Sequence, residues 1–100
     1  MWKYVAEFVA SFVFLSIIFR SANWGTSIQP ILISVGLLAA VVIAGKISGC
    51  HVNGTISTLM YLTGDKNVPD VTSLAGYLVA QFAGMYAAWW VHQQTKAAEA

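Results

Sequence analysis

Charged side chains are scarce in this chain. Lys, Arg, Asp and Glu make up 9% of its 100 residues, whereas an average soluble domain carries about a quarter. Hydrophobic residues reach 58%, which is more apolar surface than a soluble protein of this size can bury. The net charge of +1 argues against nucleic acid, which requires a basic face. We therefore expect a multi-pass integral membrane protein with the lipid bilayer as its solvent.

Cysteine is almost absent, because Cys50 is the single one in the chain. A single cysteine cannot form an intrachain disulfide. One cysteine and two dispersed histidines are also a poor ligand set, so we expect no metal and no cofactor. His51 is the sequence neighbour of Cys50, but adjacent residues seldom align for proton transfer and no orienting acid is near. We do not expect an enzyme.

Three apolar segments, at about residues 4–20, 30–47 and 71–91, approach or reach the length of a membrane span. Glu7 is the single charge within the first, and an ionisable group inside a span indicates function, although Glu7 lies near enough to the end to reach the headgroups. Small residues at four-residue spacing let helices pack closely in lipid. These predicted packing positions are Gly36, Ala40 and Ala44 in the second segment and Gly76, Ala80 and Gly84 in the third.

The stretch at residues 48–62 differs from these segments. Gly49 and Gly54 are typical of a loop, and Asn53 is a strong helix N-cap, because its side-chain oxygen can accept a backbone N–H of the next turn. The apolar run that follows ends at Leu62, after roughly half the length of a membrane span. Such a short element is tolerated at membrane depth only when it is buried in protein or lines a watery path. We predict one unit over residues 1–100, an all-α membrane protein with three transmembrane helices and a re-entrant half-helix.

Three segments of the chain resemble one repeat of the aquaporin (major intrinsic protein) family. They are residues 6–10 (AEFVA), residues 45–53 (GKISGCHVN) and residues 77–84 (YLVAQFAG), in the family's order and at nearly ungapped spacing. The chain has half the usual length of the family. The resemblance implies half of an aquaporin fold. In that fold two oppositely oriented repeats enclose a pore for water or small neutral solutes, and their half-helices meet at the midplane.

The chain departs from the family in its signature and at two further positions. The family's Asn-Pro-Ala signature is Asn53-Gly54-Thr55 here, and glycine leaves the turn looser than proline would. Ile56 stands where the second repeat of the family has its selectivity arginine, so the chain is more similar to a first repeat. Ile33 stands at the aromatic position of the constriction. The last two changes predict a wider and less polar constriction.

The resemblance also assigns roles to individual residues. Glu7 and Gln81 are expected to lie behind the loop and to hydrogen-bond its backbone. For Cys50 the alternative is a thiol packed in the protein interior. The expected pore-lining residues are Asn53, His51, Cys50, Gly49, Val52, Ile33 and Ile56.

The charges predict how copies of the chain assemble. Three lysines (Lys3, Lys46 and Lys66) would lie on one side of the membrane and Arg20 and Lys96 on the other, a weak bias that permits both orientations. We expect an antiparallel homodimer with its two-fold axis in the membrane plane. The resemblance implies four such dimers. The alternative is a non-conducting structural or regulatory membrane protein that pairs with itself or with a full-length aquaporin.

Overall fold

The computed structural model describes residues 1–22, 25 and 27–96, and within them the chain forms four helices and no strand. They are α1 (Trp2–Ser21), α2 (Gln29–Ser48), α3 (Gly54–Thr63) and α4 (Val71–Thr95). The prediction of an all-α chain is confirmed for these residues. The three long helices begin and end within four residues of the predicted segments, and α3 ends one residue after the predicted half-helix.

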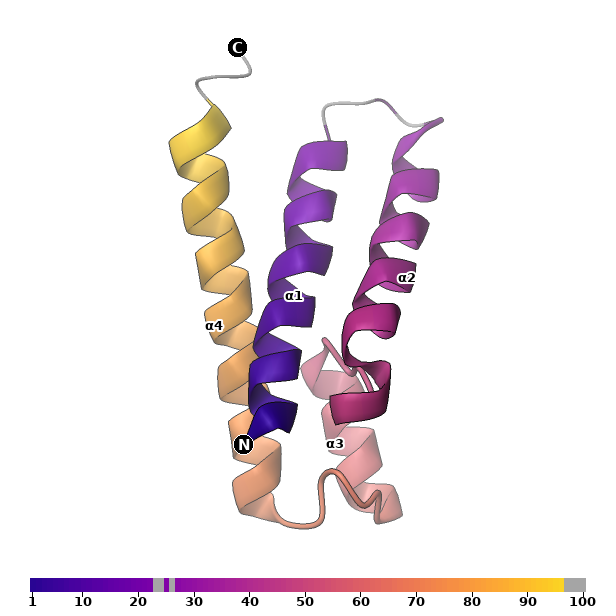
Figure 1. Ribbon diagram of the computed structural model, residues 1–100, viewed down its shortest axis with the longest axis vertical. Coiled ribbons are helices and arrows are strands. Elements are labelled where there is room, and N and C mark those ends of the chain that lie inside the picture. The colour runs from indigo at the N-terminus through magenta and orange to yellow at the C-terminus, as the bar shows by residue number, and fades with distance from the viewer. Residues whose placement is uncertain (23–24, 26, 97–100) are drawn as a thin grey trace.

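The helices are arranged around α1, which lies between α2 and α4 (Figure 1) and contacts both of them. Helices α1 and α4 run in the same direction and α2 runs in the opposite one. After α2 the chain turns back, so that α3 starts partway along the molecule and runs to the end at which α1 begins. Helix α3 contacts α4. The short helix therefore starts partway along the bundle and ends at its edge.

Local residue chemistry explains where the shorter elements begin and end. The side-chain oxygen of Asn53 accepts the backbone N–H of Thr55 at 2.8 Å and so caps α3. Gly64 ends this helix with a φ of 81°, a left-handed conformation that glycine adopts without steric cost. Asp70 caps α4 by accepting the N–H of Ser73. The hydrogen bonds from Ser73, first from its backbone and then from its side chain, lower the pKa of Asp70, so this cap weakens only when the pH falls through that lowered pKa.

Small residues mark the close approaches between the long helices. Ala40 and Ala44 of α2 are completely buried, and Gly36, on the same face, lies against Ile17 of α1. On the other side of α1, a Cβ atom added to Gly84 would stand 2.6 Å from the carbonyl oxygen of Phe8. Ala80 and Gly76 lie one and two turns before Gly84 on α4, and the Tyr4 ring packs against Gly76. All six predicted packing positions thus lie on or beside a surface where α1 meets another helix.

Two of the described helices, α1 and α2, are long and apolar enough to cross a membrane. Only 22% of each of these segments is buried inside the chain. A core helix of a soluble protein would be mostly buried, so the exposed apolar surface favours association with a membrane.

Gly84→Ala tests the close crossing of α1 and α4. The new methyl group would overlap backbone atoms of α1, which cannot rotate away, so we expect the free energy of unfolding to fall by about 1–3 kcal/mol. The matched control is Gly45→Ala, whose methyl group would meet its nearest neighbour at an ordinary 3.5 Å. Chemical unfolding in mixed micelles measures both variants. Equal stability of the two variants would contradict the close crossing.

Candidate functional site

The carboxylate of Glu7 is the centre of a buried polar network. Glu7 is fully buried on α1, and its two oxygens accept four hydrogen bonds. Oε2 accepts from Ser48 Oγ at 2.5 Å and from the N–H of His51 at 3.0 Å. Oε1 accepts from the N–H of Val52 at 2.8 Å and from Gln81 Nε2 at 3.0 Å. One side chain thus connects α1 to the end of α2, to the following loop and to α4.

The loop at residues 49–53 has an unusual backbone. Gly49 has a φ of 86°, and the non-glycine residues Cys50 and Val52 have φ values of 52° and 45°. A left-handed non-glycine residue costs on the order of 1–3 kcal/mol and persists only when its surroundings hold it. Here the N–H groups of three consecutive residues are held, that of Cys50 by Ser48 Oγ and the next two by Glu7. Within the described part of the chain, the carbonyl oxygens of residues 49–52 accept no hydrogen bond.

A second layer of contacts holds the loop against α3 and α4. Ser57 of α3 is fully buried, and its hydroxyl oxygen accepts from Gln81 Nε2 at 2.8 Å and lies 2.9 Å from His51 Nδ1. The ring of His51 also packs on that of Tyr77, with centroids 4.8 Å apart, and the Tyr77 hydroxyl donates to the carbonyl oxygen of Ser48 at 2.8 Å.

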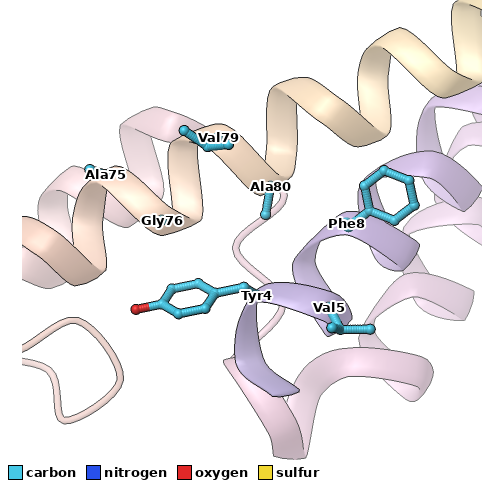
Figure 2. A pocket seen from close by; sticks show the side chains of 7 residues that line it. All are labelled: Tyr4, Val5, Phe8, Ala75, Gly76, Val79 and Ala80. Atoms are coloured by element: carbon cyan, nitrogen blue, oxygen red, sulfur yellow. The ribbon is translucent and has the colours of Figure 1, made fainter. Parts of the chain in front are cut away.

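The Tyr77 ring is itself supported by Tyr4, whose ring meets it edge-on at 5.9 Å. Tyr4 also lines a shallow groove between α1 and α4, which Figure 2 shows with the tyrosine ring beside Gly76. The other lining residues are Val5, Phe8, Ala75, Val79 and Ala80, so this groove is almost wholly apolar. No set of polar groups converges there, and we assign the groove no chemistry.

Asn53 is exposed at the start of α3. Its side-chain oxygen is used in capping, and its amide nitrogen donates to no described residue. The residue lines an open groove between α3 and α4. The other lining residues are Gly54, Thr55, Thr58, Leu59 and Leu62 of α3 and Leu78 and Phe82 of α4. We call Asn53 and the first turn of α3 the tip. The tip therefore presents an amide N–H donor at this groove.

The other predicted pore-lining residues divide into exposed and buried ones. Gly49 and Ile56 are exposed, and Val52 and Ile33 are half-buried. The side chains of Cys50 and His51, however, are buried, with residue exposures of 9% and 3%. The role of these two side chains in lining a pore stays a prediction, and within one copy both side chains are packed in the interior.

The backbone and its contacts explain why these two side chains are buried. The left-handed conformation of Cys50 accompanies the packing of its thiol among four alanines, Ala6 and Ala10 of α1 and Ala40 and Ala44 of α2. His51 is held by Ser57 and Tyr77. The alternative of a packed thiol is the one that fits Cys50.

Three members of the network were not anticipated from the sequence: Ser48, Ser57 and Tyr77. The two serines are small hydroxyl residues in or beside otherwise apolar runs, at the end of α2 and four residues after Asn53. A buried hydroxyl needs a hydrogen-bond partner, so this placement was an available signal. No group of His, Cys, Asp and Glu among the described residues could hold a metal ion.

No protein-family model, curated protein or solved structure matches this chain. The resemblance to an aquaporin repeat therefore rests on the residues of the chain itself.

Glu7→Gln tests whether the carboxylate holds the loop. The substitution replaces one acceptor oxygen by an NH₂ group, which then faces two donors. Since a hydrogen bond to a charged group contributes about 1.5–3 kcal/mol, we expect the free energy of unfolding to fall by at least that amount. Ser34→Ala is the control, because its hydroxyl is exposed and bonds only within its own helix. Full stability of Glu7→Gln in chemical unfolding would refute the role of the carboxylate.

Proposed function

We propose that this chain forms one half of a passive transmembrane channel for water and small neutral solutes, and that a second copy in the opposite orientation completes the pore. The observation that carries the proposal is the tip, a capped helix start partway along the bundle. It follows a loop in which the N–H groups of residues 50–52 are occupied and the carbonyl oxygens are not. This arrangement supplies hydrogen-bond partners along a path without providing a charged group for an ion.

The lengths of the helices support three membrane spans and a re-entrant half-helix. Helix α3 has ten residues, or about 15 Å, which is half of a hydrocarbon core of about 30 Å. Helix α4 has 25 residues, or about 37 Å, which is long enough to span. Its hydropathy is lowered by Tyr77 and Gln81, which are buried, and by Trp89 and Trp90, a residue type that favours the membrane interface. We therefore propose α1, α2 and α4 as the spans.

The mechanism we propose is electrostatic and involves no covalent chemistry. The start of a helix carries about half a positive charge. Two such starts meeting at the midplane, each with an Asn53 amide donor, would orient a water molecule by its oxygen and disfavour cations, including protons. Ile56 adds no charge next to the tip, so the constriction would admit small neutral solutes larger than water.

A single copy leaves the groove beside the tip open on one side, which is why we propose a partner. Lys3, Lys46 and Lys66 belong to the end of the molecule where α1 begins, and Arg20 and Lys96 to the other end. Three charges against two favour neither orientation strongly. We propose an antiparallel homodimer as the conducting unit and, by analogy with the family, an assembly of four such dimers.

Asn53→Leu tests conduction. The leucine removes the donor at the tip, and the loss of a hydrogen bond of about 1 kcal/mol should lower the permeability roughly fivefold. Gln94→Leu makes the same chemical change at an exposed site in the last turns of α4 and should leave the permeability unchanged. The measurement is stopped-flow shrinkage of proteoliposomes, with water and with glycerol as the permeant.

The same assay has a clear negative outcome. If the unaltered protein, both variants and empty liposomes all shrink at one rate, the channel proposal fails. That result would favour the non-conducting structural or regulatory membrane protein.

A further inference from the structure

Gly54 and Leu78 meet where α3 packs on α4. A Cβ atom added to Gly54 would stand 2.7 Å from Cδ2 of Leu78, closer than carbon atoms approach one another in proteins. The methyl group of Leu78 thus occupies the volume that a side chain at residue 54 would need. Leu78 is half-buried and also lines the groove beside the tip.

A polar contact accompanies this apolar one. Gln81 lies three residues after Leu78 on α4, and Ser57 lies three residues after Gly54 on α3, so each pair shares a helix face. Gln81 donates to Ser57 at 2.8 Å. Leu78 and Gln81 therefore hold the first turn of α3 together, one by filling space and the other by a hydrogen bond.

We propose that Leu78 is a positioning residue for the tip. Its Cδ2 methyl group fits against the bare backbone of Gly54 and sets where Asn53 lies, although Leu78 contributes no polar atom to the path. The consequence for permeation rests on the proposed channel function, whereas the positioning itself does not. A side chain at residue 54 would require the terminal methyl group of Leu78 to move from its present place, so we expect changes at residues 54 and 78 to be coupled.

A double-mutant cycle with Gly54→Ala and Leu78→Ala tests the pair. Alanine is a better helix former than glycine, so by propensity alone Gly54→Ala should strengthen the first turn of α3. The proposal requires the reverse while Leu78 is present. We expect exchange of the Thr55 amide hydrogen, which bonds to Asn53, to accelerate roughly fivefold in Gly54→Ala and to return to near the original rate in the double variant.

Gly45→Ala and Leu62→Ala serve as controls, because Gly45 has room for a methyl group and Leu62 lies on the same groove with 73% exposure. If Leu78→Ala does not fold, Leu78→Val takes its place in the cycle, since it also removes the reach of Cδ2. The proposal would be overturned if Gly54→Ala changed the exchange rate of the Thr55 amide equally with and without Leu78. Slower exchange in the Gly54→Ala single variant would overturn it as well.

Permeability of the same four proteins in liposomes gives the second readout. We expect the ratio of glycerol to water permeability to change in Gly54→Ala and to recover in the double variant. If the two substitutions have non-additive effects on amide exchange but none of the proteins conducts, the positioning role of Leu78 is supported and the channel proposal is rejected. If the two substitutions have additive effects on amide exchange and the proteins conduct, the positioning role of Leu78 is rejected and the channel proposal stands.

Discussion

The structure depends on the carboxylate of Glu7. A buried charge is costly unless donors surround it, and here four donors from α2, the loop and α4 do so. The same bonds satisfy backbone N–H groups that no helix can satisfy, because the loop is irregular. In a lipid environment each such group left without a partner costs several kcal/mol. The carboxylate and the loop therefore stabilise each other, and neither arrangement is favourable alone.

The orientation of the loop follows from the hydrogen bonds between its backbone and the Glu7 carboxylate. With the N–H groups directed to Glu7 and Ser48, the left-handed residues Cys50 and Val52 are held in place and the carbonyl oxygens are left free. The buried alanines of α1 and α2 provide the space into which the Cys50 thiol packs. The tip is held separately, by the hydrogen bond from Gln81 to Ser57 and by the packing of Leu78 against Gly54.

The parts of this arrangement that sequence predicts are the local ones. The cap by Asn53 and the short helix after it follow from a few adjacent residues, and the long helices from their apolar composition. The sequence left the burial of Cys50 as an alternative and did not predict that of His51, because both depend on positive φ values at Cys50 and Val52 that the adjacent residues do not dictate. The contacts of Ser57 with Gln81 and of Gly54 with Leu78 join residues more than twenty positions apart, so local reasoning could not find them. The support by Glu7 was inferred through family resemblance and not through spacing.

The most direct test of the account is the distance between the Glu7 carboxyl carbon and the amide nitrogens of His51 and Val52 in lipid bilayers. Solid-state NMR with ¹³C–¹⁵N recoupling, on protein labelled at these residues, measures it. Hydrogen bonds of 3.0 and 2.8 Å to the carboxylate oxygens predict carbon–nitrogen distances below roughly 4.5 Å for both amides. Absence of transfer from Glu7 to either nitrogen, in protein that retains its helices, would contradict the account.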